Sequence, residues 1–186
     1  MQRADSFAFP AAAWRAGYLE DISPRRLVLE QYDQEHAALR RYLSCLGLTA
    51  DASQEILQES FLKLHQHLLA GGDRTNLRAW LYRVAHNLAR NLQTAFSARK
   101  LEAIPEYTGT GALSWGGVSP EEDLLARERV TRLRRAMAEL SAPQRECLVL
   151  RAQGFKYREI AEVLNLSIST VGENIQRGLE KLKERL

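Results

Sequence analysis

Lys156 to Arg177 reads KYREIAEVLNLSISTVGENIQR, and this stretch predicts two short helices joined by a tight turn. Three apolar residues of its first half share one helical face: Ile160, Ala161 and Leu164. Asn165 tolerates the left-handed conformation in which a helix ends, and Ser167 or Ser169 can cap the helix that follows. The pattern is typical of the helix-turn-helix of DNA-binding proteins, and the alternative is an ordinary helical hairpin in an all-α core.

The second helix of this pair should bury an apolar stripe against the first, and small Ala161 should lie where the two cross. The expected members of the stripe are Val171, Ile175, Leu179 and Leu182. Each of the two helices before the pair begins at a serine cap, Ser119 or Ser141, and Gly154 ends the later one. The sequence therefore predicts a four-helix C-terminal domain over residues 120–186.

Residues 24–100 also follow helical periodicity, and no part of them alternates apolar and polar residues as a strand would. Three helices are expected, from Pro24 to Gly47, from Asp51 to Leu69 and from about Asn76 to Ala98. Ser23 before a proline is a typical start of the first helix, and Asp51 is the expected cap of the second. These helices form a separate N-terminal domain.

Two segments lack such a pattern. Residues 1–23 are rich in alanine, without a clear period, and are expected to form a loosely ordered lead-in. Residues 101–119 contain Pro105 and four glycines, so they cannot form a long helix and are predicted to be a flexible linker. The sequence thus predicts an all-α protein of two small helical domains.

The composition, 45% hydrophobic and 26% charged, is that of a globular protein without a membrane-spanning run or a secretory signal. Cys45 and Cys147 are predicted to be buried thiols of a protein in the reducing cytoplasm. His65 and His67 lie two residues apart on a helix and cannot share a metal ion. No phosphate loop or nucleophile motif is present, so we expect neither an enzyme nor a cofactor.

Charge is distributed unevenly along the N-terminal domain. The chain from Arg74 to Lys100 contains six basic residues and no acidic one, whereas Asp51, Glu55 and Glu59 form an acidic face just before it. Adjacent helices of opposite sign suggest two different partners, one of them polyanionic.

Two longer stretches, one in each half, make the interpretation more specific. In the N-terminal half, DASQEILQESFLKLHQHL followed by NLRAWLYRVAHNLARNL resembles the core-binding and promoter-opening domain of bacterial RNA polymerase sigma factors. In the C-terminal half, ELSAPQRECLVLRAQGFKYREIAEVLNLSISTV resembles their second promoter-reading domain. The order of the two and the short linker are similar to the extracytoplasmic-function (ECF) group. The resemblance covers about Val28 to Leu186.

The resemblance implies a role for the second helix, which matches the family's polymerase-binding helix. That helix packs on a coiled coil of the largest catalytic subunit of the core enzyme. The residues implied are Asp51, Gln54, Glu55, Gln58 and Glu59. An alternative for any one of them is a solvated helix face.

The third helix matches the segment that engages the minus-ten promoter element as it melts. A positive surface that follows a displaced strand is usual for such binding. The candidates are Arg78, Arg83, Asn87 and Arg90. Trp80 falls on the apolar stripe and is expected in the core instead.

The last helix should enter the major groove at the minus-thirty-five element, N-terminal end first. The candidate residues on this helix are Ser169, Thr170, Glu173, Asn174 and Arg177. Lys156 and Arg158, on the preceding helix, should clamp the DNA backbone. Family members commonly have a lysine or arginine in the turn after Thr-Val, where this chain has Gly172, Glu173 and Asn174. Glu173 should repel phosphates unless it accepts a hydrogen bond from a cytosine amino group.

The sequence leads us to expect a sigma factor whose partners are core RNA polymerase and promoter DNA, with an anti-sigma factor as a candidate third partner. Two alternatives remain open. A conventional helix-turn-helix regulator should be a dimer that binds palindromic duplex DNA without polymerase. A sigma-like interaction module should bind polymerase or an anti-sigma factor without promoter output.

Overall fold

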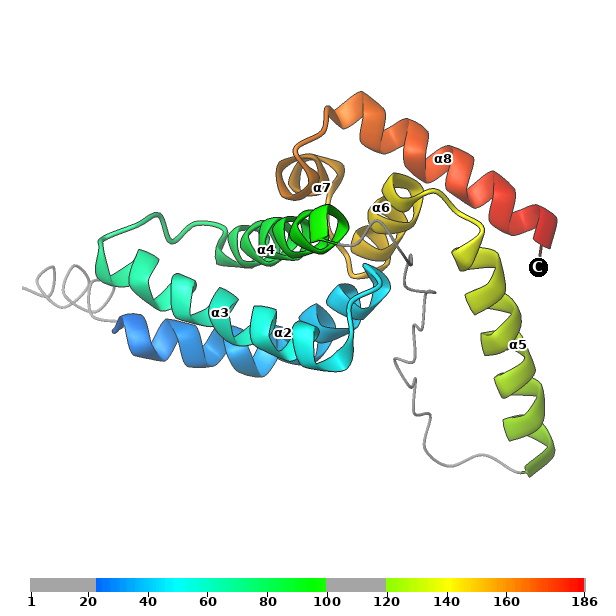
Figure 1. The fold of residues 1–186 in the computed structure, drawn as a ribbon, viewed down its shortest axis with the longest axis horizontal. Helices are drawn as coiled ribbons and strands as arrows, with labels where there is room; N and C mark the ends of the chain where they lie inside the picture. The colour runs from blue at the N-terminus through cyan, green and yellow to red at the C-terminus, as the bar shows by residue number, and fades with distance from the viewer. Residues whose placement is uncertain (1–22, 100–119, 186) are drawn as a thin grey trace, which may run out of the picture.

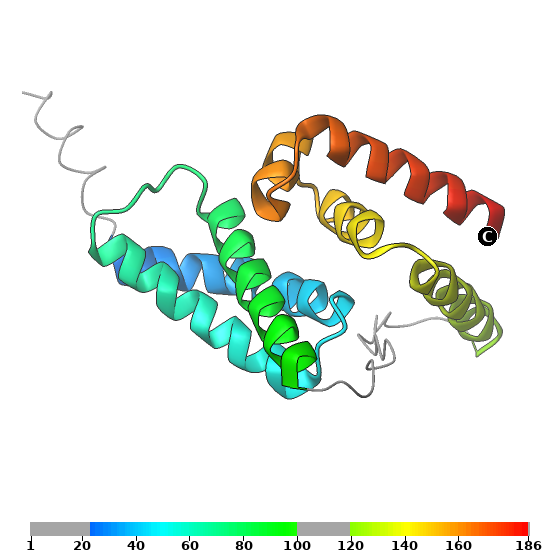
Figure 2. The ribbon, with the colours of Figure 1, turned by 45° about the horizontal axis from the view of Figure 1, so that its top comes forward.

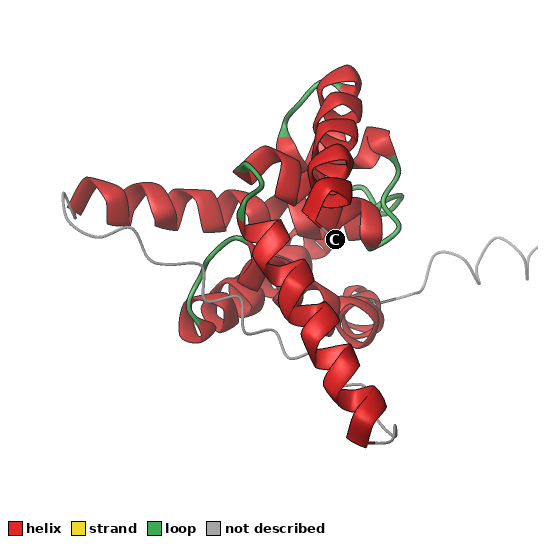
Figure 3. Cartoon of the chain, turned by 90° about the vertical axis from the view of Figure 1, so that its right-hand side faces the viewer, coloured by secondary structure: helices red, strands yellow, loops and turns green. Residues whose placement is uncertain are grey.

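The computed structural model describes residues 23–99 and 120–185, and all regular structure in these ranges is helical (Figure 3). The helices are α2 (Pro24–Cys45), α3 (Ala50–Leu69), α4 (Leu77–Arg99), α5 (Pro120–Ala138), α6 (Ala142–Ala152), α7 (Tyr157–Leu164) and α8 (Ile168–Arg185). The predicted all-α class is therefore confirmed. The expected lead-in up to residue 22, the linker 101–119 and the Ser119 cap lie outside the described residues.

The N-terminal half is built from α2, α3 and α4. α2 and α3 lie side by side in opposite directions, and α4 packs across both of them (Figures 1 and 2). Their shared core consists of fully buried side chains that include Leu39, Tyr42, Leu43, Leu64, Leu81 and Tyr82. This packing fixes which sides of α3 and α4 remain open to partners.

Caps set the ends of these helices as the sequence predicted, with one exception. Ser23 Oγ accepts a hydrogen bond from Arg26 N at 3.3 Å at the start of α2. At the start of α3 the cap is Thr49, whose Oγ1 accepts from Ala52 N at 3.3 Å, so the expectation that Asp51 is the cap was wrong. Asp51 lies inside the first turn, where its charge favours the positive end of the helix dipole.

The C-terminal half contains the predicted helix-turn-helix. α7 ends at Asn165, which has a positive φ of 53°, and Leu166 N donates to Ala161 O at 3.0 Å to close the turn. Of the two candidate caps it is Ser167 that begins α8, because its Oγ accepts from Thr170 N at 3.1 Å. Gly154, with φ of 91°, separates α6 from α7 as expected.

The buried stripe of α8 differs from the prediction at one position. Val171 and Ile175 are buried as expected, but Leu179 is 45% exposed, and Gly178 takes the inward place instead. Gly178 faces α6, where a β-carbon would come within 2.7 Å of Leu148 Cδ1. The absence of a side chain allows α8 and α6 to approach closely.

The two halves touch one another. α4 packs against α7 and α2 against α6, whereas α5 extends away and contacts α8 (Figures 1 and 2). The first helix of the helix-turn-helix therefore lies directly on the helix that carries the predicted minus-ten residues.

Candidate interaction surfaces

The outer side of α3 carries the predicted polymerase-binding residues. Four of the five are exposed and Glu59 is half-buried, with its carboxylate 3.1 Å from Lys63 Nζ. The opposite side of the helix is buried, from Ile56 and Leu57 to Phe61 and Leu64. The structure therefore brings Asp51, Gln54, Glu55, Gln58 and Glu59 together on one solvent-facing side.

Leu62 adds an apolar group that was not predicted from the sequence. It is 50% exposed and follows Gln58 by four residues and Glu55 by seven, so the three lie on one side of α3. Leu69, one further heptad along, is 64% exposed. The sequence contained a signal for this apolar group, because Leu62 and Leu69 fall outside the helical positions of the buried stripe. A surface that combines polar residues with an apolar centre is suited to a protein partner.

The four predicted minus-ten residues lie on two different sides of α4. Arg83, Asn87 and Arg90 follow one another at spacings of four and three, and all three are exposed. Arg78 lies on a different side of the helix and is partly buried. The first three form a surface, which we call the α4 edge, that has two guanidinium groups and one amide open to an anionic strand.

Arg78 instead contacts both halves of the protein. Its Nε lies 2.8 Å from Glu35 Oε1, and its Nη2 donates to Gln153 O at 2.9 Å. Its guanidinium also lies over the ring of Phe155, 4.2 Å from the centroid. Arg78 is therefore engaged inside the molecule in this arrangement and not directed to solvent as the other three are.

The predicted minus-thirty-five residues gather at the start of α7 and along the first turns of α8. Lys156, Arg158, Ser169, Glu173 and Arg177 are exposed, whereas Thr170 and Asn174 are half-buried. Asn174 Nδ2 donates to Thr170 O at 2.9 Å, so part of its hydrogen-bonding capacity is used within the helix.

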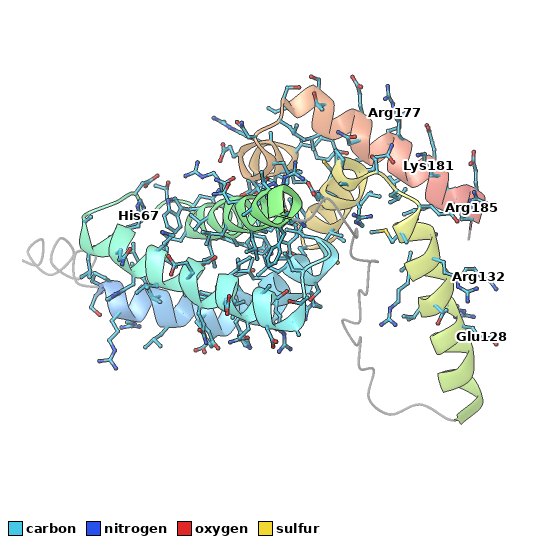
Figure 4. All side chains as sticks on the ribbon, viewed as in Figure 1. His67, Glu128, Arg132, Arg177, Lys181 and Arg185 are labelled. Atoms are coloured by element: carbon cyan, nitrogen blue, oxygen red, sulfur yellow. The ribbon has the colours of Figure 1, made fainter. Side chains whose placement is uncertain are left out.

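Charge on this surface is partly neutralised by neighbouring acids. Glu173 Oε2 lies 3.5 Å from Arg177 Nη2 on α8, and Arg158 Nε lies 3.7 Å from Glu162 on α7. Arg177 projects from α8 away from α6 and α7 (Figure 4). Because both pairs are exposed, they are weak, and a phosphate could displace either acid.

Tyr157 is a further residue of this surface that was not predicted from the sequence. It is 39% exposed, and a β-carbon at Gly172 would contact its ring at 3.8 Å. The guanidinium of Arg151 lies 5.6 Å from the centre of the same ring. The sequence could have indicated this residue, because Tyr157 lies between two predicted members of the surface, Lys156 and Arg158.

The inward side of α4 holds a buried polar pair. His86 Nδ1 lies 2.8 Å from Tyr42 Oη, and burial, with the nearby charge of Arg90, lowers the pKa of His86 to about 4. The same burial raises the pKa of Tyr42 well above its usual value. Both groups are therefore neutral at pH 7 and stabilise the core through their hydrogen bond.

The other residues considered for chemistry have structural roles. The His67 ring stacks on Trp80 with centroids 4.6 Å apart, and its Nε2 lies 3.0 Å from Asp73 O near the start of α4 (Figure 4). Cys147 is a buried free thiol, whereas Cys45 is only partly buried. In the described ranges, no cluster of three or more histidines, cysteines or acidic residues is arranged to hold a metal ion. None of the helices described is long and apolar enough to cross a bilayer.

Comparison with known proteins identifies the relatives of this chain. Residues 131–182 match the family described as Sigma-70, region 4. The chain is 31% identical over 157 residues to the ECF RNA polymerase sigma factor SigL of Mycobacterium tuberculosis, covering 82% of this chain and 84% of SigL. It is 28% identical over 156 residues to the RNA polymerase sigma factor SigZ of Bacillus subtilis, covering 83% and 84%.

Solved structures share the fold. The sigma factor RpoE from Bartonella quintana, solved with the anti-sigma factor NepR, has a TM-score of 0.62 at 21% identity and covers 83% of this chain and 93% of its own. CnrH, solved with the cytosolic domain of CnrY, has a TM-score of 0.60 at 23% identity, covering 91% and 92%.

Proposed function

The chain belongs to the extracytoplasmic-function group of RNA polymerase sigma factors, and from this premise we propose that α3, α4 and α8 divide its binding tasks. As a sigma factor it binds core RNA polymerase, recognises and opens promoter DNA and directs transcription initiation. Sigma factors regulate initiation without catalysing a reaction themselves.

The outer side of α3 is the proposed contact with the core enzyme. The observation that carries this assignment is the exposure of Leu62 among Glu55 and Gln58, on a helix whose other side is fully used by the core. The partner is the coiled coil of the largest catalytic subunit. Desolvation of Leu62 would supply affinity, and the acids and amides around it would set the orientation.

The α4 edge is the proposed contact with the melting minus-ten element, and α7 with α8 is the proposed contact with the minus-thirty-five element. Arg83, Asn87 and Arg90 can follow a displaced strand because they line one exposed side of a rigid helix. The exposed N-terminal turns of α8 fit the usual docking of a recognition helix in the major groove. We assign residues 24–100 to a domain that binds core polymerase and the minus-ten element, and residues 120–186 to a domain that binds the minus-thirty-five element.

Two further assignments follow from the proposal. The protein acts in the cytoplasm, where polymerase and promoter DNA are found. An anti-sigma factor is included among its partners, because the RpoE relative was solved with one.

The proposal is tested with the purified full chain and core RNA polymerase. Affinity capture should recover a complex of the two, and this complex should produce run-off transcripts from a promoter chosen by selection from random DNA. Absence of a complex with core would overturn the proposal. A dimer that binds palindromic duplex tightly without polymerase would indicate a conventional regulator instead.

A matched pair of leucines tests the α3 assignment. Leu62→Ala should weaken core binding by about tenfold or more if Leu62 is buried on binding. Leu29→Ala on α2 is the control, because Leu29 is similarly exposed at 53% but lies on another helix. Equal effects of the two substitutions would contradict the assignment.

A further inference from the structure

A cavity of about 250 Å³ lies where α4, α6 and the end of α7 meet, near the centre of the molecule (Figure 1). Two residues of α4 line it, with three of α6 and two from the end of α7 and the turn that follows. Its volume is just below the range of about 300–1,000 Å³ that is usual for ligand pockets, so it is suited to a small molecule. The cavity is separate from the surfaces assigned above, except that it reaches the α4 edge at Arg90.

Two opposite charges line the cavity from different helices. Glu146 on α6 is half-buried, and Arg90 on α4 is exposed. Burial raises the pKa of the Glu146 carboxyl, and the positive charge of Arg90 opposes this rise, so the two groups act on each other. Within the described parts of the chain, however, no ion pair joins them. The cavity therefore separates a guanidinium from a partly desolvated carboxylate.

The rest of the lining is one neutral polar side chain and four apolar ones. His86 Nδ1 is bonded to Tyr42 Oη, so Nε2 is the ring nitrogen left for a further hydrogen bond. The apolar side chains are Ala142 and Pro143 at the start of α6, Leu164 at the end of α7, and Leu166 in the turn. A few polar groups set among apolar ones are typical of a site that fixes the orientation of a small ligand.

We propose that this cavity binds a small zwitterion with an apolar side chain, such as an aliphatic α-amino acid. Arg90 holds the carboxylate of the ligand, because a planar guanidinium can donate to both of its oxygens. Glu146 accepts from the ammonium group, and the aliphatic side chain packs on Leu164 and Leu166. The ligand thereby pairs each of the two charges that do not reach each other.

The two charges together favour a zwitterion over a ligand with a single charge. A simple carboxylate can pair with Arg90, but it leaves the half-buried Glu146 without a cation and adds a second negative charge beside it. A simple amine pairs with Glu146 and makes no use of Arg90. Only a molecule that carries both charges a short distance apart satisfies both sides of the cavity.

Occupation of the cavity has a consequence for DNA binding, because Arg90 also belongs to the α4 edge. A ligand whose carboxylate is held by Arg90 competes with the phosphates of the displaced strand for the same guanidinium. This consequence rests on the proposed function of the α4 edge, whereas the ligand site itself does not.

Calorimetric titration of the free full chain tests the site, with L-leucine as the probe. L-leucine should give a saturable signal, and two analogues that keep its side chain but lose one charge, isocaproate and isoamylamine, should each bind about tenfold more weakly or worse. Glu146→Gln should weaken L-leucine binding by about tenfold or more without changing the affinity for isocaproate. Ala142→Leu keeps both charges but fills the cavity, and it should abolish binding.

Two matched substitutions serve as controls for that titration. Arg83→Gln removes an exposed arginine of the same helix, and Glu128→Gln removes an exposed glutamate of α5; neither residue lines the cavity. Both variants should bind L-leucine as the parent does. Circular dichroism of Glu146→Gln and Ala142→Leu establishes that each is folded, and Glu146→Gln alone decides the site if Ala142→Leu is not.

Each result bears on a distinct claim. The absence of a saturable signal at millimolar L-leucine, or equal affinity for isocaproate, would overturn the zwitterion site. Undiminished affinity in Glu146→Gln would place the binding elsewhere and overturn it as well.

Transcription tests the competition at Arg90. L-leucine added before core polymerase should reduce run-off transcripts made with the parent and not those made with Glu146→Gln. Equal reduction in the two would refute the competition. If the protein supports no transcription, the proposed function fails, whereas the calorimetry on the free chain still decides the ligand site.

Discussion

Gly178 on α8 approaches Leu148 on α6 so closely that a β-carbon at position 178 would lie 2.7 Å from Leu148 Cδ1. Gly172 lies in the same helix six residues earlier, yet a β-carbon there would meet only the Tyr157 ring at 3.8 Å, an ordinary contact. The two glycines therefore differ in what they do: Gly178 permits the crossing of α6 and α8, and no packing in the structure requires Gly172.

This difference predicts opposite effects on stability. Gly178→Val should lower the free energy of unfolding by about 1–3 kcal/mol, because the added methyl groups must displace Leu148 or separate the helices. Gly172→Ala should raise it by about 0.5–1 kcal/mol through helix propensity. Urea unfolding of the full chain, followed by circular dichroism, measures both. A loss at position 172 as large as that at position 178 would contradict this account.

Gly178 shows where reasoning from the sequence about the fold succeeds and where it fails. The turn at Asn165 and the Ser141 cap, whose N–H donates to Gln144 Oε1 at 3.2 Å, were predictable because the signals are local. A count of apolar residues assigns the inward place to Leu179, since it cannot score a residue that has no side chain. The inward place of Gly178 depends on the position of α6, which the local pattern does not contain.

The candidate surfaces show a similar limit. Helical spacing alone separates Arg78 from Arg83, because Arg78 shares its side of α4 with Tyr82, four residues later. The prediction placed the two arginines in one set because both belong to the helix that resembles the minus-ten segment, and the structure places them on different sides of that helix. The partners of Arg78, however, are Glu35 and Phe155, which are remote in sequence and belong to different halves. Only the packing of the halves reveals them.

The buried His86 predicts a loss of stability in mild acid. Burial lowers the pKa of His86 to about 4 in the folded protein, against about 6.5 when it is exposed in the unfolded chain. Between these values the unfolded chain binds the proton that the folded protein excludes, so the free energy of unfolding falls as the pH falls from 6.5 to 4. His86→Gln removes this effect and can still accept from Tyr42 Oη.

Urea unfolding at pH 7 and at pH 5 measures the effect. The parent should lose about 1–2 kcal/mol more than His86→Gln over this interval. An equal loss in the two proteins would mean that His86 is already protonated, or free to become so, in the folded state.

The cap that Ser167 provides at the start of α8 should contribute to the stability of the protein. Its Oγ accepts from Thr170 N at 3.1 Å and lies within 2.8 Å of the Ser169 hydroxyl. Ser167→Ala should cost about 1 kcal/mol of stability, whereas Ser167→Asp should cost little, because aspartate is an equally good cap. Thermal unfolding of the two variants measures this. An aspartate variant as unstable as the alanine variant would argue against capping.

Glu173 should limit the affinity of α8 for DNA. Its carboxylate lies 3.5 Å from Arg177 Nη2, and both side chains are about two-thirds exposed. Glu173 therefore partly neutralises the charge of Arg177 at the surface that is proposed to contact the phosphates. Glu173→Gln should release Arg177 and tighten binding to the upstream duplex. The slope of log affinity against log salt should steepen by about 0.9 for each additional phosphate that the protein neutralises. Gly172→Lys with Glu173→Ser should increase affinity further, because it adds a cation.

Glu180→Gln is the matched control in that experiment, because Glu180 is an exposed acid of the same helix, nearly two turns beyond Glu173. Its carboxylate accepts a hydrogen bond from Gln176 Nε2 at 3.1 Å. Holoenzyme binding to promoter DNA, titrated at several salt concentrations, should change little in this variant. If Glu173 accepts from a cytosine amino group, Glu173→Gln should also relax the base preference at one position of the element. Unchanged affinity and salt slope in Glu173→Gln and in the Gly172→Lys, Glu173→Ser double variant would indicate that this side of α8 contacts something other than DNA.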